Sequence, residues 1–474
     1  MRGRSLLNRH ESISLQFIDN HHRRYYIDCT RLNCLVVNER KKINSMKRLF
    51  ILLIGLLLIS TMLLSACAES RSAHTQSTPT LTPAISPTPT PSSTAAYNIE
   101  QAISDQAQQN TIAFDALGFI TGNLCSDSFL PPGKVSDFFG FQYLRDNTAD
   151  GMGHNTDFVT NCANGVLYIL DDSQKAQMIA LAGDQVSTVN DYAYKRFPLM
   201  EAFRRLLEGD IPAGSSGLNR SAVMAYSAEL YMIDANISML RAELFGSIIK
   251  SLNESQRAYL DSMVQGGFAS WPVLPDQVDK TSLSHDEHVL VMTYASEMFG
   301  WYAGSIEADT YFCPERQGDY FGGFYIKDAP AIGNAGYTIN ETITGNSGEN
   351  FLEALNEAQA KLVTDLVNIQ RDDINDIVAK RQAIATELRL YLTGSSIDQD
   401  AVLTLAARYG ELDGEISYYY ATNFAEVAKT LTSEQQEQLM QLRGLEEFSC
   451  DGAYLYSGKI AMPEIMNTDF LFEN

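Results

Sequence analysis

The feature of this sequence that most restricts its fold is an internal repeat. Residues 114–146 match residues 296–328 without a gap, and the match includes three identical glycines. Within it, the aromatic segment "SDFFGFQYLRD" at 136–146 recurs as "GDYFGGFYIKD" at 318–328. The match continues further along the chain, with "VNDYAYKR" in the first copy and "INDIVAKR" in the second. A repeat of this kind indicates that one structural unit occurs twice.

The repeat predicts two homologous units of about 180 residues, a length that fits one domain each. We place the first unit at 98–275 and the second at 284–460, followed by a C-terminal tail at 461–474. In both units apolar residues recur at helical spacing, and no sustained alternation indicates strands. The sequence therefore predicts an all-α fold of two tandem helical-hairpin or bundle domains that arose by internal duplication.

Residues 46–66 have the layout of an export signal, with a charged start, an apolar stretch and small residues at the end. Leu64–Cys67 resembles the lipobox of bacterial lipoproteins. The resemblance implies that Cys67 is lipidated, becomes the first mature residue and anchors the exported protein to the cell membrane or outer membrane. A permanent transmembrane anchor is the alternative, but the apolar stretch is short for a membrane span.

Two further segments are expected to lie outside any folded domain. Residues 1–45 resemble neither a signal nor a domain, so we interpret them as a mis-called extension and expect Met46 to be the true start. Residues 67–97 contain the lipidated cysteine followed by a Ser/Thr/Pro-rich stretch without apolar periodicity. Such a composition cannot bury enough surface to fold and is typical of an extended linker.

Removing residues 1–66 makes the mature chain strongly acidic. The chain has 35 Lys and Arg residues and 58 Asp and Glu residues, of which 11 and 4, respectively, lie in residues 1–66. The remaining 24 basic and 54 acidic residues give a net charge of −30. Such a surface repels nucleic acid, which we exclude as a partner, and it suits cations or basic partners. Solubility alone is the simpler interpretation of the charge.

Four cysteines remain after Cys67, an even number that allows two disulfides in an exported protein. The duplication favours pairing within each unit, although Cys125 aligns with Glu307 and other connectivities stay open. The pairs would be Cys125 with Cys162 and Cys313 with Cys450.

Four helices are predicted to begin with one pattern, in which a leucine precedes an N-cap residue and a glutamine follows the cap by three residues. The cap side chain can accept a backbone hydrogen bond while the glutamine reaches back to the cap, which is a capping box. The four segments are "LDDSQKAQM" at 170–178, "LNESQRAYL" at 252–260, "LNEAQAKLV" at 355–363 and "LTSEQQEQL" at 431–439.

Two such helix starts occur in each predicted unit. This layout resembles the LTxxQ (Spy/CpxP-like) family of periplasmic helical proteins, in which two LTxxQ segments frame a helical hairpin. The resemblance covers 170–265 and 355–443, and the segment at 431–439 matches the motif in full. It implies long antiparallel helices that form a curved cradle, which family members build as dimers and two fused copies could supply here. It also implies non-enzymatic binding of a protein or peptide client, in a chaperone-like or envelope-stress role.

The segment "DNTADGMGHNTD" at 146–157 has the spacing of a calcium-binding loop, with oxygen-bearing residues at positions 1, 3, 5 and 12 and glycine at position 6. These residues are Asp146, Thr148, Asp150 and Asp157. A bound Ca²⁺ would favour a calcium-stabilised surface or adhesion module, the alternative to a client-binding protein. A turn that binds no ion is the other interpretation, because the second copy lacks the pattern.

The repeated aromatic segments have two interpretations. Their side chains could line a paired groove for an apolar peptide, or they could seal the end of each helical bundle as buried plugs. The residues are Phe138, Phe139, Phe141, Tyr143, Tyr320, Phe321, Phe324 and Tyr325.

No established catalytic motif occurs in the sequence: GxSxG, HExxH, P-loop and dinucleotide fingerprints are all missing. We therefore assign no catalytic residue, and an enzyme with unrecognised carboxylate chemistry is a further alternative. The histidines of "HDEH" at 285–288 favour a helix N-terminus over a zinc or copper site, because no third ligand lies nearby in sequence.

Overall fold

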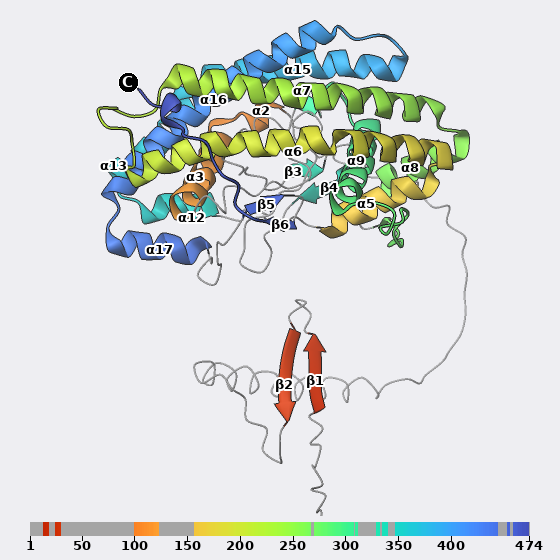
Figure 1. Ribbon diagram of the computed structural model, residues 1–474, viewed down its shortest axis with the longest axis horizontal. Helices are drawn as coiled ribbons and strands as arrows, with labels where there is room; N and C mark the ends of the chain where they lie inside the picture. Colours follow the sequence, from red (N-terminus) through yellow and green to blue (C-terminus); the bar gives the residue numbers. More distant parts are fainter. Residues whose placement is uncertain are drawn as a thin grey trace, which may run out of the picture. The chain divides into compact units, whose positions relative to one another are not determined.

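Long helices dominate the computed structural model of the chain (Figure 1). The structure describes residues 13–18, 24–29, 99–122, 156–266, 270–307, 309–310, 329–331, 334–339, 347–443, 453–455 and 458–473. The fold is all-α, as the helical spacing predicted. The strands in these residues form three short antiparallel hairpins of two strands each.

The chain divides into two units, residues 1–89 and residues 90–474. The described part of the first unit is one hairpin, β1 (Ile13–Ile18) and β2 (Arg24–Cys29), with Ile13 opposite Cys29. This hairpin falls within the segment that we interpret as an extension. Cys67 and the linker lie outside the described residues.

The second unit contains the helices. They are α2 (Ile99–Ala102), α3 (Asp105–Thr121), α5 (Thr156–Ile169), α6 (Asp172–Glu208), α7 (Arg220–Ser251), α8 (Glu254–Gly266), α9 (His285–Ala303), α12 (Ser347–Ala354), α13 (Glu357–Thr364), α14 (Leu366–Ile369), α15 (Arg371–Thr393), α16 (Gln399–Thr430) and α17 (Ser433–Arg443). Short elements complete it: β3 (Ala329–Ala331), β4 (Asn334–Ile339), β5 (Ala453–Leu455), β6 (Gly458–Ile460) and the 3₁₀ helix η3 (Asp469–Leu471). A search of the described helices found none with the length and apolarity of a membrane span.

The four longest helices, α6, α7, α15 and α16, lie side by side in a layer (Figure 1). The two central helices, α7 and α16, approach each other closely where the sequence provides glycine. A Cβ atom on Gly410 would lie 2.8 Å from the Cα of Ala228, and one on Gly414 would lie 2.8 Å from the Cβ of Ser227. Because real Cβ atoms do not come so close, glycine is what permits this packing.

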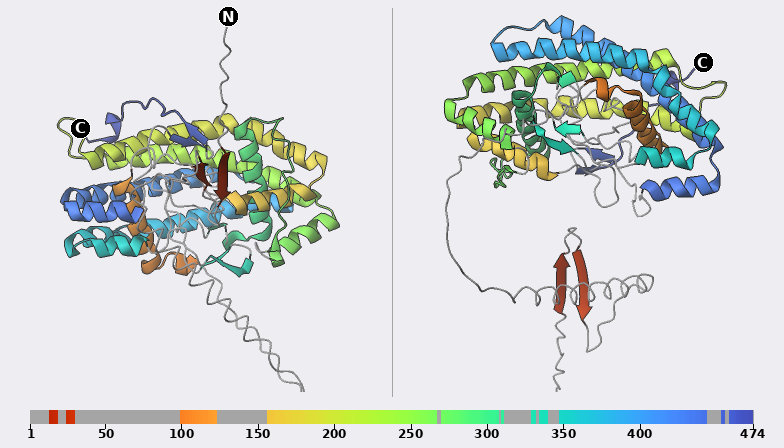
Figure 2. Two further views of the ribbon diagram at one scale, coloured as in Figure 1. Left: turned by 90° about the horizontal axis from the view of Figure 1, so that it is seen from below. Right: turned by 180° about the vertical axis from the view of Figure 1, so that it is seen from behind.

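Two groups of shorter helices lie at opposite ends of the layer (Figure 1, Figure 2). One end contains α3, α12, α13 and α17, and the other contains α5, α8 and α9. The first long helix of each predicted unit therefore packs with the other unit: α3 packs on α12, whereas α9 packs on α5 and α6. The predicted copies at 98–275 and 284–460 interlock within a single spatial unit.

The described helices of the two predicted copies correspond in position. Both α7 and α16 have 32 residues, so the two helices align from their first residue to their last without a gap. Both α6 and α15 end at a left-handed glycine, Gly209 in the first copy and Gly394 in the second. These matches agree with the duplication, which stays a prediction.

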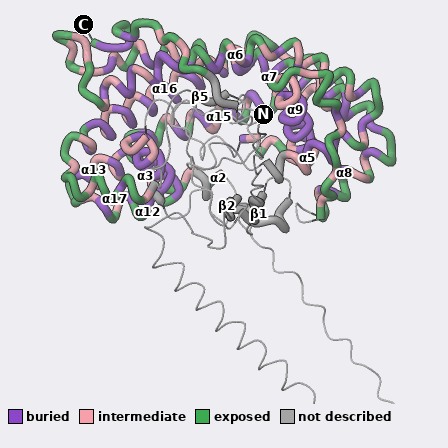
Figure 3. The backbone as a smooth tube through the Cα atoms, turned by 60° about the horizontal axis from the view of Figure 1, so that its bottom comes forward, coloured by how far each residue is buried: buried purple, intermediate pink, exposed green. Residues whose placement is uncertain are grey.

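One continuous apolar core connects the layer with both end groups. It includes Phe203 and Phe245 from the first predicted copy and Tyr409 and Phe424 from the second. Figure 3 shows buried positions alternating with exposed ones along the long helices, as expected for helices that bury one face.

Candidate functional site

Most of the predicted site residues lie outside the described residues. These are Cys67, Cys125, Cys313 and Cys450, the calcium-loop residues Asp146, Thr148 and Asp150, and the aromatic residues Phe138, Phe139, Phe141, Tyr143, Tyr320, Phe321, Phe324 and Tyr325. Asp157 belongs to the first turn of α5, although its side chain is not described. The calcium site, the aromatic groove and the lipid anchor stay predictions.

Cys162 is a buried residue of α5. Its thiol forms no disulfide with any described residue, so the predicted pairing with Cys125 also stays a prediction. Burial raises the pKa of the thiol far above its usual value, against a smaller opposing effect of a hydrogen bond with Ser296. A thiol in this environment is a packing group rather than a nucleophile.

The glutamines of the first two repeated helix starts join two helix N-termini. Gln174 completes a capping box with Asp171, and Gln256 accepts a hydrogen bond from the backbone N–H of its own cap, Asn253 (2.9 Å). The side-chain amide of Gln256 also donates to Oε1 of Gln174 (2.8 Å) and to the carbonyl oxygen of Ile169 (2.7 Å). The start of α6 is thereby tied to the start of α8.

The second predicted copy repeats this connection. Gln435 donates to Oε1 of Gln359 (2.8 Å) and to the carbonyl oxygen of Ala354 (2.8 Å), while Gln359 donates to the carbonyl oxygen of Thr430 (2.9 Å). The capping boxes predicted at 355–363 and 431–439 are confirmed. The connection between two boxes was not predicted, because a capping box is a local pattern and its partner lies 76 residues away. We call each pair of glutamines a glutamine clip.

At the end that contains α9, a charged network crosses the core. Arg241 of α7 and Glu297 of α9 are buried and form an ion pair at 3.1 Å. Arg241 also donates to the hydroxyl of Tyr294 (3.2 Å), which in turn donates to Oε1 of Gln185 in α6 (2.6 Å). Burial opposes the charge on Arg241, yet Glu297 and Tyr294 hold its pKa above the usual value. The network joins α6 and α7 to a helix of the other predicted copy.

At the end that contains α3, the corresponding network has a tyrosine in place of the arginine, close to the buried carboxylate of Asp115, which aligns with Glu297 in the repeat. Tyr420 takes the place of Arg241 when α16 is aligned with α7, and Gln370 takes the place of Gln185 when the final glycines of α15 and α6 are aligned. The hydroxyl of Tyr420 donates to Oε1 of Gln370 (2.6 Å), and Nε2 of Gln370 donates to Oε1 of Gln108 in α3 (2.8 Å). Burial, followed by the carboxylate of Asp115, raises the pKa of Tyr420 well above its usual value.

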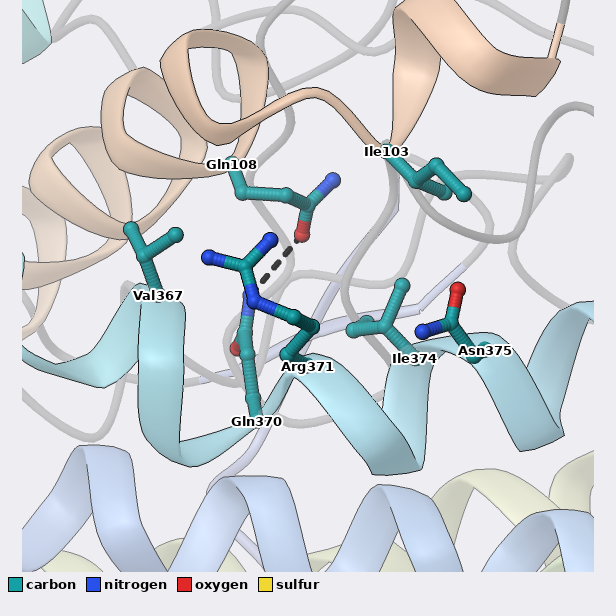
Figure 4. A pocket seen from close by; sticks show the side chains of 7 residues that line it. All are labelled: Ile103, Gln108, Val367, Gln370, Arg371, Ile374 and Asn375. Carbon is teal, nitrogen blue, oxygen red and sulfur yellow. Dashed lines mark hydrogen bonds between the residues drawn. The ribbon is translucent and has the colours of Figure 1, made fainter.

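A cavity of about 100 Å³ lies beside Gln108 and Gln370 of this network, between α3 and the start of α15 (Figure 4). It is lined by Ile103, Gln108, Val367, Gln370, Arg371, Ile374 and Asn375. Gln108 and Gln370 bond to each other, and Arg371 pairs with Asp105 (2.5 Å). The polar groups around this cavity thus hold α3 against α15, and the space suits at most a few atoms.

A cluster of acidic and basic residues lies where α15, α16 and the start of α7 meet. Asp373 is partly buried there, and burial, reinforced by Glu415, raises its pKa to about 6. Arg220 of α7 pairs with Glu415, and Arg408 pairs with Asp376 (3.4 Å). Among the described residues, no group of three or more His, Cys, Asp or Glu side chains has the arrangement of a metal site.

The geometry therefore assigns the motif glutamines and the buried polar residues to helix association. The chain matches no protein-family model, no curated protein and no solved structure.

Proposed function

We propose that this protein is a membrane-anchored extracytoplasmic lipoprotein that binds protein or peptide clients without catalysing a reaction, in a chaperone-like or envelope-stress role. Lipidated Cys67 would hold it at the membrane, and residues 67–97 would act as the spacer. The proposal extends the resemblance to the LTxxQ family from the motif to the arrangement of the helices.

The observation that carries the proposal is the pair of glutamine clips, one at each end of a single layer of long helices. Each clip bonds the first helix of a set to the last helix of that set, and both of these helices start with the repeated motif. A family dimer would supply two such sets from two chains. Here the duplication would supply both, and the exchange of α3 and α9 would fix one against the other.

Interlocking supports a binding role for a physical reason. A framework that is already ordered loses less conformational freedom when it binds, and each end here contains helices from both predicted copies. Opening one end would require breaking the ion pair of Arg241 and Glu297 or the bonds of Gln370. Such a framework keeps its outer surfaces fixed relative to one another.

The test is suppression of client aggregation by the purified protein. An enzyme that aggregates on heating is mixed with the protein or with the same mass of serum albumin, and light scattering is followed. We expect scattering to fall to a plateau as the protein approaches the concentration of the client. Scattering equal to that with albumin, together with no binding to peptides from the unfolded client, would remove the client-binding role.

The anchor is tested separately with Cys67→Ser. The variant should leave the membrane fraction and lose incorporation of labelled fatty acid, while wild type retains both. Unchanged membrane association of Cys67→Ser would contradict the lipoprotein assignment and favour a transmembrane anchor.

A further inference from the structure

The C-terminal tail presents apolar side chains to solvent where it crosses α6 (Figure 1). Met462, Met466 and Phe470 expose 37, 59 and 46% of their surfaces, and Tyr194 of α6 exposes 42%. Single exposed apolar residues are common on proteins, but a group of them on one surface marks an interaction site. We call these four residues the tail strip.

The tail is fixed to the loop between α6 and α7. The backbone N–H of Asn219 donates to the carbonyl oxygen of Leu471 (2.8 Å), and the N–H of Glu473 donates to the carbonyl oxygen of Gly217 (2.9 Å). Arg205 of α6 pairs with Asp469 (2.8 Å). The corresponding loop between α15 and α16 is six residues shorter, so the tail strip is a feature of the first predicted copy alone.

Contacts beneath the tail connect it to α6 and α7. Ile465, next to Met466, packs against the buried residues Phe197 and Met200 of α6. The ring of Phe197 stacks at 6.2 Å on Tyr194, and the ring of Phe470 lies 5.8 Å from Tyr226 of α7. Tyr194, Ile465 and Phe470 therefore contact aromatic side chains of α6 and α7.

Carboxylates lie near Tyr226 and Arg205, two side chains that contact the tail. Glu229 and Asp191 act electrostatically on Tyr226, whereas Glu208 and Asp210 act on Glu201. The carboxylates are Asp191, Glu201, Glu208, Asp210, Glu229 and Asp469. Lys195 and Arg205 lie among them, and both already pair with acidic side chains.

We propose that the tail strip docks a cationic and apolar segment of a partner protein, which deepens the proposed client-binding function by naming the chemistry of the client. Methionine side chains adapt their shape to different apolar surfaces, and two of the four residues are methionines. The carboxylates beside the tail attract Lys and Arg side chains, whose stems can cover apolar surface while their charges reach the carboxylates. The acidity of the whole chain favours the same class of partner.

The experiment measures fluorescence anisotropy of a labelled peptide of Leu and Lys with the full purified chain. Matched peptides of Leu and Glu and of Ser and Lys test the apolar and the cationic requirement separately. We expect the Leu/Lys peptide to bind at least about tenfold more tightly than either control. Its affinity should also fall when ionic strength rises from about 0.05 M to about 0.5 M.

Variants locate the binding. The double variant Met466→Ser with Phe470→Ser should weaken Leu/Lys binding about tenfold. The control Leu240→Ser with Val273→Ser replaces apolar residues elsewhere that are at least as exposed on average, and it should not change binding. Likewise Glu208→Gln with Glu229→Gln should reduce affinity, and Glu243→Gln with Glu254→Gln should not. Melting temperatures within a few degrees of wild type show that each variant folds.

The outcomes separate this inference from the proposed function. If client aggregation is suppressed equally by wild type and the Met466→Ser, Phe470→Ser variant, the tail strip is not the docking surface although the function stands. A second outcome is that aggregation is not suppressed, but the Leu/Lys peptide binds wild type and binds the Met466→Ser, Phe470→Ser variant more weakly. The client-binding role then fails, and the tail strip is retained as a docking surface. Equal binding of the Leu/Glu peptide overturns the proposed chemistry.

Discussion

The two ends of the helical layer use different side chains to join a helix of one predicted copy to the long helices of the other. At one end, Arg241 and Glu297 join α7 to α9 through a buried ion pair. At the other end, Tyr420 occupies the position of Arg241, and its hydroxyl and the amides of Gln370 and Gln108 join α16 to α14 and α3. One network links α9, and the other links α3, to the long helices of the other predicted copy.

Buried polar networks therefore occupy equivalent positions at both ends, and the residue that differs is the one on the long helix, Arg241 or Tyr420. A buried carboxylate lies at equivalent positions of both ends, Glu297 in α9 and Asp115 in α3, but the long helix beside it carries Arg241 at one end and Tyr420 at the other. The two networks differ in what happens when one member is lost. A buried charge without its partner costs far more than a buried hydroxyl or amide does.

The largest expected effect follows from Arg241→Met. Glu297 would keep a charge in the core without Arg241, and we expect the free energy of unfolding to fall by about 3–5 kcal/mol. Tyr420→Phe, the matched change at the other end, should cost only about 1–2 kcal/mol. Urea unfolding followed by circular dichroism measures both. Equal losses of stability in the two variants would show that Arg241 and Tyr420 do not differ in their contribution. Adding Glu297→Leu to Arg241→Met should restore most of the lost stability.

The glutamine clips should respond alike at the two ends. Gln256→Ala and Gln435→Ala each leave two acceptors without the amide that now donates to them, so each should lower the free energy of unfolding by about 1–3 kcal/mol. Gln177→Ala, which removes an exposed hydrogen bond to Ser173, is the control and should have little effect. A loss confined to one variant would mean that only one clip contributes to stability.

A smaller effect depends on pH. The pKa of Asp373 is raised from 3.8 to about 6, so the folded protein binds this proton more tightly than the unfolded chain does. The resulting stabilisation is present below about pH 4 and is lost as the pH rises through about 6. Asp373→Asn should therefore be more stable than wild type above pH 6, by under about 1 kcal/mol after solvent screening, and not below pH 4.

Unfolding in urea at pH 4 and pH 8 measures this difference. Thr188 stands at the position equivalent to Asp373 in the first predicted copy, so Thr188→Asn serves as the control without a titrating group. An advantage of Asp373→Asn that is the same at both pH values would show that the charge of Asp373 is not its cause.

The smallest expected effect concerns the segment at 146–157, which has no counterpart in the second copy. If this loop binds Ca²⁺, adding the ion should raise the melting temperature of wild type by a few degrees but leave Asp150→Ala unchanged. Asp184→Ala, at an exposed position of α6, should keep the shift. An identical response in all three proteins would assign any calcium effect to the general negative charge.

The helix starts were predictable because capping is a local interaction. Asp171 and Gln174 are three residues apart, and both hydrogen bonds of their box form between neighbours in sequence. The ion pair of Arg241 and Glu297 spans 56 residues, and the bond between Gln370 and Gln108 spans 262. Nothing in the local pattern of a helix distinguishes a buried Arg from the solvated Arg that is far more common.

The sequence alone determined the all-α class and the start of each motif helix, because apolar period and capping residues act within one or two turns of the chain. Only the tertiary structure decided that α3 and α9 exchange places, that the motif glutamines clip helices together in pairs, and that the tail lies on α6. Those outcomes depend on which surfaces bury the most apolar area together. The total buried apolar area includes contacts between residues hundreds of positions apart, so a local sequence pattern does not reveal it.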